Sequence, residues 1–448
     1  MRYKDSILNI IFTKDVWTLV SGSAISQVLI LSFVPVLTRL FLPEEFGVFY
    51  LFLTTASILS IIVTGGYEKS LVLPKYENEA RQLLMFSLML SVVVTILCFI
   101  ISLFLNSWGG AFFQTRHSRF IFWLIPVYSF LFGSFRIFQN WAIRDKKYSF
   151  VSRSNIIRSG SLSGLQTGFG IFHTGSFGLV LGSCISQLIP IWYLVWKNKT
   201  PHEKSTMKNL KEAYKRGMEY KSFPVFRMPS ELMNEVSIQM PVYVLKAVFN
   251  NTVVGLFSLP QKILSQPSRF LGQAMAEVYY RQASEIKTQN KELSELTFST
   301  YKTLLMIGII PFSVVMFWGP EIFSFIFSEG WESSGRIASY MCPWLLFVFA
   351  GSPISYIFLI KQKLNLSFYL NLLLLFIRSI SLLIGSLIFK SVGMTIILFA
   401  GSSFVYWLVL SLFSLYLGGV DFRRSVLFTL ATLLLIVLPL GLIRLFLL

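Results

Sequence analysis

The sequence predicts an all-α, polytopic membrane protein with two six-helix lobes around a central cavity and an additional thirteenth helix. Three observations support this fold class: long apolar runs, an uneven distribution of Lys and Arg, and an internal repeat. The chain has 448 residues, of which 54% are hydrophobic and 13% are charged. This composition excludes a soluble globular protein of the ordinary kind.

The apolar runs are long enough to cross a bilayer, which requires roughly 20 residues of α-helix. They predict thirteen transmembrane helices, called spans one to thirteen here, at residues 16–41, 46–66, 83–105, 120–142, 156–172, 177–196, 222–249, 253–276, 303–327, 338–360, 364–389, 393–417 and 425–448.

The basic residues gather in alternate connecting segments. If the N-terminus is inside, the inner segments hold 26 of the 39 Lys and Arg residues, and the outer loops hold four: Arg116, Arg119, Arg336 and Lys390. Positive residues favour the cytoplasmic side of a membrane. We therefore expect a multi-pass protein with a cytoplasmic N-terminus. The net charge of +18 then reflects loops that face an anionic leaflet, and no nucleic-acid partner is expected.

An internal repeat appears when the sequence is shifted by 208 residues. Span one then falls on span seven, and eight of the 24 positions from 28 to 51 are identical to their shifted counterparts, among them Phe41 with Phe249 and Gly47 with Gly255. Six spans separate the copies, so both copies begin inside. This predicts a parallel repeat of two bundles that enclose a midplane substrate site.

The repeat also sets the expected domain boundaries. We expect an N-terminal lobe at 1–196, a cytoplasmic linker at 197–221, a C-terminal lobe at 222–417 and an appended helix at 418–448.

Five basic residues lie deep inside the spans. A charge at this depth costs several kcal/mol in lipid, so each should face a cavity or a partner. These residues are Arg136, Arg227, Lys262, Arg269 and Arg378.

Span eight carries a polar face. Lys262, Gln266, Arg269 and Gln273 recur at i, i+4, i+7 and i+11, which places them on one side of a continuous α-helix. Pro267 lies in the same span and would bend it. The face is interpreted as lining a substrate cavity, with a polar contact to another helix as the alternative.

Span seven carries Arg227, Glu231 and Glu235 at four-residue intervals. Arg227 and Glu231 are spaced to form an ion pair within the helix, which leaves open whether Arg227 faces the cavity. Glu235 has no obvious partner left on this helix, so it is the first candidate for a protonatable gate, and Glu231 is the second.

Arg378 and Arg136 each allow two interpretations. Arg378 lies near the middle of span eleven and either lines the cavity or pairs with an acid of span seven. Arg136 follows an aromatic stretch and precedes Gln139 and Asn140, a combination that suits a sugar-binding face or simple packing.

Span five carries a stripe of regularly spaced glycines. Gly160, Gly164 and Gly168 recur every four residues, a spacing that favours close helix packing.

The chain has no GxxxxGK[ST], HExxH or CxxC motif, so no ATP hydrolysis, metal or cofactor is expected. The outer loops are too short for a catalytic domain, which argues against a membrane enzyme.

Two segments resemble a known family. They are Gly22–Gln27 with Pro35–Leu40 and Pro43–Gly47, and Asn234–Pro241 with Val254–Leu259. Both are similar to the O-antigen and capsule polysaccharide flippases of bacteria. That family shares a superfamily with multidrug/oligosaccharidyl-lipid exporters and lipid II flippases, and the resemblance covers most of residues 16–417.

The resemblance implies a function in the bacterial inner membrane. Such proteins move an undecaprenyl-diphosphate-linked oligosaccharide from the cytoplasmic to the periplasmic leaflet by alternating access. It also implies the lipid bilayer, a polysaccharide polymerase and a chain-length regulator as partners. Two departures are Lys262, where such flippases often have Arg, and the thirteenth span.

A cation-coupled multidrug exporter, or an exporter of another lipid-linked precursor, from the same superfamily is the alternative. Those exporters commonly carry an acidic residue in the first lobe. Here spans one and three to six contain no carboxylate, and Glu68 lies only at the inner edge of span two.

Overall fold

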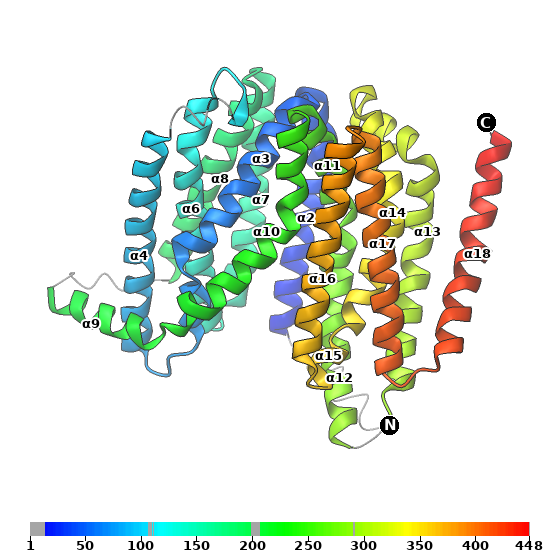
Figure 1. The fold of residues 1–448 in the computed structure, drawn as a ribbon. Helices are drawn as coiled ribbons and strands as arrows, with labels where there is room; N and C mark the ends of the chain where they lie inside the picture. Colours follow the sequence, from blue (N-terminus) through cyan, green and yellow to red (C-terminus); the bar gives the residue numbers. More distant parts are fainter. Residues whose placement is uncertain (1–13, 106–109, 111, 199–206, 290–291, 448) are drawn as a thin grey trace. The chain divides into compact units, whose positions relative to one another are not determined.

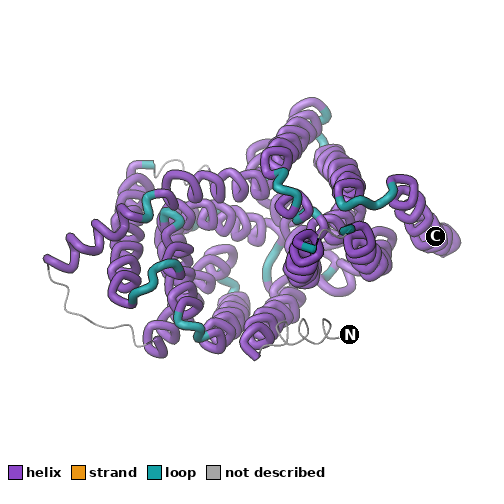
Figure 2. Tube along the Cα trace, turned by 90° about the horizontal axis from the view of Figure 1, so that it is seen from below, coloured by secondary structure: helices purple, strands orange, loops and turns teal. Residues whose placement is uncertain are grey.

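The computed structural model describes residues 14–105, 110, 112–198, 207–289 and 292–447. Within these residues all regular structure is helical and no strand is present (Figure 2). Ten helices in this part of the chain are long and apolar enough to cross a membrane. The predicted all-α, multi-pass fold class is therefore confirmed.

The chain divides into two compact units, Met1–Met240 and Pro241–Leu448, called unit 1 and unit 2 here. The helices of unit 1 are coloured blue to green in Figure 1. They are α2 (Lys14–Leu40), α3 (Pro43–Thr64), η1 (Tyr67–Val72), α4 (Glu77–Phe104), α6 (Ser118–Arg144), α7 (Tyr148–Ile171), α8 (Gly175–Asn198), α9 (Met207–Glu219), η2 (Phe223–Arg227) and most of α10 (Met228–Val248).

Unit 2 begins inside α10. Its further helices are α11 (Asn251–Leu264), η3 (Ser268–Gly272), α12 (Gln273–Thr288), α13 (Ser294–Phe327), η4 (Glu329–Trp331), α14 (Glu332–Ile354), α15 (Ile357–Ile360), α16 (Leu364–Leu383), η5 (Ile384–Ile388), α17 (Val392–Leu417) and α18 (Phe422–Leu447). The lobe boundaries expected from the sequence, at 196 and 222, remain a prediction.

Three of the predicted spans differ from the other ten. Spans five, seven and eight, at 156–172, 222–249 and 253–276, are helical, but they are not among the ten helices that are long and apolar enough to cross a membrane. Spans seven and eight carry most of the candidate site residues. Their polarity indicates that these helices are not surrounded by lipid alone.

The helix boundaries repeat as the sequence shift predicts. Leu40 and Val248, which end α2 and α10, are 208 residues apart, and so are Pro43 and Asn251, which begin α3 and α11. Both starts have a local cause. Pro43 opens α3 with its φ angle already helical, and the Asn250 side chain caps α11 by accepting a hydrogen bond from the backbone N–H of Val253 at 3.0 Å.

In unit 2, α13 and α14 approach each other through glycine. A Cβ atom at Gly335 would lie 2.2 Å from the carbonyl oxygen of Gly319, and one at Gly319 would lie 2.4 Å from that of Gly335. The thirteenth helix, α18, then packs on α13. Arg424 pairs with Glu295 at 2.6 Å, and the Tyr301 hydroxyl lies 3.1 Å from that of Thr429.

The glycines of span five do not act as expected. A Cβ atom added at Gly160, Gly164 or Gly168 would meet no other described atom within 4 Å. The prediction that this stripe lets another helix approach closely is therefore wrong. Because glycine has no side chain, these positions leave open space along α7 instead.

Candidate functional site

The polar face predicted on span eight is interrupted. After α11, the backbone passes through a π-helical turn, η3, which starts directly after Pro267. A π turn holds more residues than an α turn, so it shifts the angular register of everything that follows. Lys262 and Gln266 precede this turn, whereas Arg269 lies within it and Gln273 follows it. The expectation of one continuous α-helical face is therefore wrong.

The four side chains accordingly have different environments. Gln266 is buried at 6% exposure, Lys262 is half-buried, and Arg269 and Gln273 are exposed. The Gln266 amide donates to the carbonyl of Lys262 at 3.0 Å, while its own Oε1 has no hydrogen-bond partner among the described residues. Arg269 forms no ion pair within the described part of the chain.

Arg378 on α16 is held by aromatic rings. Its guanidinium carbon lies 5.0 Å from the ring centroid of Trp344 and 5.4 Å from that of Phe399, and its Nε donates to the hydroxyl of Ser403 at 3.0 Å. Cation–π contacts of this kind stabilise a cation without neutralising it. No carboxylate pairs with Arg378 among the described residues of unit 2, and the ion pair with span seven that the sequence allowed stays a prediction.

Arg136 in unit 1 is in a different environment, next to a carboxylate. It pairs with Glu68 at 2.7 Å, and the Glu68 side chain is fully buried while that of Arg136 is 23% exposed. Neither oxygen of Glu68 has a partner in hydrogen-bond geometry among the described residues, so the contact is chiefly electrostatic. Glu68 therefore neutralises Arg136, and sequence reasoning missed this because it discounted Glu68 as an edge residue.

Arg227 is neutralised within its own helical segment. Its Nη2 lies 3.0 Å from the carboxylate of Glu231, the i,i+4 pair that the sequence allowed. Arg227 is 47% exposed and Glu231 26%, so solvent screens the pair and its contribution to stability is small.

Glu235 belongs to a hydrogen-bond network between α10 and α3. Its Oε1 accepts from the hydroxyl of Ser57 and from the amide of Gln239, both at 3.0 Å. The Thr54 hydroxyl in turn donates to Oε1 of Gln239 at 3.3 Å. The expectation that Glu235 has no partner on its own helix is wrong, because Gln239 lies at i+4. Sequence reasoning did not single out Ser57 and Thr54.

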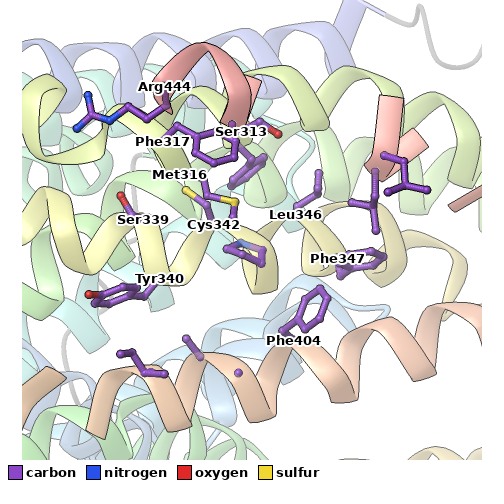
Figure 3. Close-up of a pocket in the computed structure, with 18 residues that line it drawn as sticks. Ser313, Met316, Phe317, Ser339, Tyr340, Cys342, Leu346, Phe347, Phe404 and Arg444 are labelled. Atoms are coloured by element: carbon purple, nitrogen blue, oxygen red, sulfur yellow. The ribbon is translucent and has the colours of Figure 1, made fainter. Parts of the chain in front are cut away.

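Unit 2 also contains an apolar cavity that the sequence did not predict. It has a volume of about 920 Å³ and lies among α13, α14, α17 and α18 (Figure 3). Phe317, Leu346 and Phe404 are among its lining residues, and Arg444 lies at its edge, where it pairs with Glu321. The cavity holds none of the predicted site residues.

Comparison with known structures shows the fold class. The lipid II flippase MurJ in an inward closed conformation matches with a TM-score of 0.67 at 15% identity, over 93% of this chain and 90% of that one. An inward-facing multidrug resistance MATE family transporter of the MOP superfamily matches with a TM-score of 0.61 at 13% identity, over 89% of this chain and 96% of that one. At these identities the two matches show that this chain shares the fold of those proteins.

Comparison of sequences gives the family. The lipopolysaccharide biosynthesis protein WzxC of Escherichia coli (strain K12) is 22% identical over 177 residues, which are 39% of this chain and 35% of that protein. The match thus spans about a third of the relative's length. The family model described as polysaccharide biosynthesis protein matches residues 36–336, more than half of the chain. On that match, and in agreement with its all-helical membrane fold, this chain belongs to the polysaccharide biosynthesis protein family.

Proposed function

We propose that the protein is a flippase that moves an undecaprenyl-diphosphate-linked oligosaccharide from the cytoplasmic to the periplasmic leaflet of the inner membrane. The family and the flippase-type fold support movement of a lipid-linked polysaccharide precursor. The diphosphate carries negative charge, so its binding site needs positive charge that the protein has not already neutralised.

The distribution of neutralised charge carries this proposal. In unit 1, Arg136 is paired with Glu68 and Arg227 with Glu231. In unit 2, Arg269 is exposed and Arg378 is held by aromatic rings, and neither has an acidic partner among the described residues of that unit. Unit 2 therefore keeps positive charge that is free to compensate an anionic ligand.

We assign the diphosphate contacts to Lys262, Arg269 and Arg378. Gln266 and Gln273 supply neutral amide groups on the same segment, and the unpaired Oε1 of Gln266 suits a sugar hydroxyl or a water that bridges to one. Arg136 and Arg227 are assigned structural roles in this proposal, because their charges are already compensated.

The test is the double variant Lys262→Ala/Arg269→Ala in cells that depend on this gene for surface polysaccharide. Loss of one basic partner of a bound anion costs about 1–3 kcal/mol, or roughly 5- to 150-fold in occupancy. We expect little surface polysaccharide and an accumulated lipid-linked oligosaccharide inside the cell, at normal protein level. Arg269→Lys should keep part of the activity, since the charge survives without the bidentate fork.

A matched control removes two charges elsewhere. Lys361→Ala/Lys363→Ala changes two exposed lysines of the segment between α15 and α16, and it should leave polysaccharide export intact. Normal polysaccharide from the Lys262/Arg269 double variant at wild-type abundance would contradict the proposed site.

A cation-coupled exporter of drugs or of another lipid-linked precursor is the second candidate function. The observation in its favour is Glu68, a fully buried carboxylate in unit 1, where such exporters carry their coupling acid. If the protein exports drugs, deletion of the gene should raise drug sensitivity and leave surface polysaccharide unchanged.

A further inference from the structure

The short helix α9, which lies in the segment between the two predicted lobes, is docked tightly on α4. Its buried face consists of Ala213 at 0% exposure and Gly217 one turn later. A Cβ atom at Gly217 would lie 2.4 Å from the ring of Phe86, so the two helices touch at this point. The contact fixes which side of α9 is turned away from unit 1.

Polar contacts hold the same docked position. Arg216 pairs with Glu79 at 3.1 Å, and the Gln82 amide donates to Glu212 at 2.9 Å. The Tyr67 hydroxyl donates to the carbonyl of Gly217 at 3.0 Å, and burial raises the pKa of Tyr67, which keeps this donor protonated. The second acid of α9, Glu219, is also engaged, because it pairs with Arg216 at 2.6 Å.

The place of docking corresponds to a membrane boundary. The first turns of α4 carry Glu77, Glu79 and Arg81, and from Leu83 onward the helix is apolar. The contacts of α9 with Glu79, Gln82 and Phe86 straddle this change. A spanning helix changes from charged to apolar where it enters the hydrocarbon core. In Figure 1, α9 lies crosswise to α4 near the start of that helix, as a helix in the plane of the interface does.

The flank of α9 beside this contact carries a stripe of four exposed residues, one of which, Tyr214, also meets the Phe86 ring of α4 edge-on at a centroid distance of 6.2 Å. Lys211, Tyr214, Lys215 and Met218 recur at i, i+3, i+4 and i+7, and all four are exposed, Tyr214 at 58% and Met218 at 43%. Neither lysine has an acidic partner among the described residues, since both acids of α9 are engaged elsewhere. The stripe thus offers two uncompensated ammonium groups beside an aromatic and an apolar side chain.

We propose that this stripe binds the anionic phospholipid headgroups of the cytoplasmic leaflet. Lysines extend their ammonium groups to headgroup phosphates while the alkyl stems cover apolar surface. Tyrosine has its polar end and apolar ring at the same level. The proposal assumes the cytoplasmic location of this segment that the basic residues predict, but it does not depend on which substrate is moved.

The experiment compares hydrogen–deuterium exchange of residues 207–219 in the full-length protein in two kinds of nanodisc. One kind contains phosphatidylcholine alone, and the other also contains phosphatidylglycerol. Each lysine near an anionic surface contributes a factor of about 5, so we expect exchange to be slower with phosphatidylglycerol by up to about 30-fold.

Variants assign the effect to the stripe. Lys211→Gln/Lys215→Gln should exchange like the wild type in phosphatidylcholine and lose the slowing by phosphatidylglycerol, whereas Lys211→Arg/Lys215→Arg should keep it. The control Lys361→Gln/Lys363→Gln removes two exposed lysines from unit 2 and should also keep it.

Three outcomes would overturn the proposal. The first is equal exchange of the wild type in both nanodiscs. The second is a slowing that persists in the Lys211→Gln/Lys215→Gln variant. The third is faster exchange of this variant already in phosphatidylcholine, which would mean that the lysines stabilise docking on α4 and do not bind lipid.

Discussion

The ion pair between Glu68 and Arg136 makes a quantitative prediction about the stability of unit 1. The variant Arg136→Gln leaves a fully buried carboxylate without its counter-charge. Removal of one partner of a buried ion pair costs about 3–5 kcal/mol. Because the Arg136 side chain is 23% exposed, solvent reaches one end of the pair, and we expect a loss of about 3 kcal/mol.

The double variant Glu68→Gln/Arg136→Gln should recover most of this loss. It removes both charges and leaves two amides that can bond to each other, so no charge is buried alone. Each kcal/mol shifts the melting temperature of a unit of this size by about 2–4 °C. Arg136→Gln should therefore melt about 6–12 °C below the wild type. The melting temperature of the double variant should be much closer to that of the wild type. Glu68→Gln should be intermediate, because Arg136 can turn its charge toward solvent.

The assay is thermal unfolding of the purified variants, followed by tryptophan fluorescence, together with surface polysaccharide in cells. If Arg136 acts through Glu68 alone, the double variant regains stability and polysaccharide together. Equal stability of Arg136→Gln and the wild type would refute the reasoning. Recovery of stability without recovery of polysaccharide would instead assign Arg136 to the substrate.

Two further predictions concern Glu235 and the glycine contact of unit 2. Glu235→Gln keeps an oxygen that accepts the hydrogen bond from Ser57, so protein abundance should stay normal. If Glu235 couples transport to protons, polysaccharide export measured across external pH should lose its pH dependence in this variant. An unchanged pH profile would exclude that role. Gly335→Ala forces a methyl group against the backbone of Gly319 and should destabilise the protein by about 1–3 kcal/mol or more in thermal unfolding. Gly330→Ala is the matched control and should leave the melting temperature unchanged, because a Cβ atom there meets nothing within 4 Å. Equal melting temperatures of the two variants would contradict the close contact.

The sequence was informative where the physical signal is local. Apolar runs predicted the helices, and the shift of 208 residues matched the ends of α2 and α10. The pair of Arg227 and Glu231 could be foreseen because one turn of helix separates them. These features depend on periodicity within a single helix, which a sequence records directly.

Features that depend on contacts between segments, or on a local change of helix type, were not predictable. Glu68 and Arg136 lie on different elements of unit 1, so no spacing rule connects them. The rings around Arg378 come from α14 and α17, and Phe is too abundant in this chain for a sequence to single them out. The π turn after Pro267 changed the register of the expected polar face, although the proline itself indicated a bend.

The environment of Arg378 has an electrical consequence. Aromatic rings stabilise its guanidinium without cancelling its charge, whereas the pair of Glu68 and Arg136 is neutral as a unit. When an elementary charge crosses the whole membrane potential, its free energy changes by about 2.3 kcal/mol per 100 mV. Any displacement of α16 along the membrane normal during transport therefore moves gating charge, and displacement of the neutral pair moves none. Arg378 is thus one residue through which the membrane voltage would act on the transport rate.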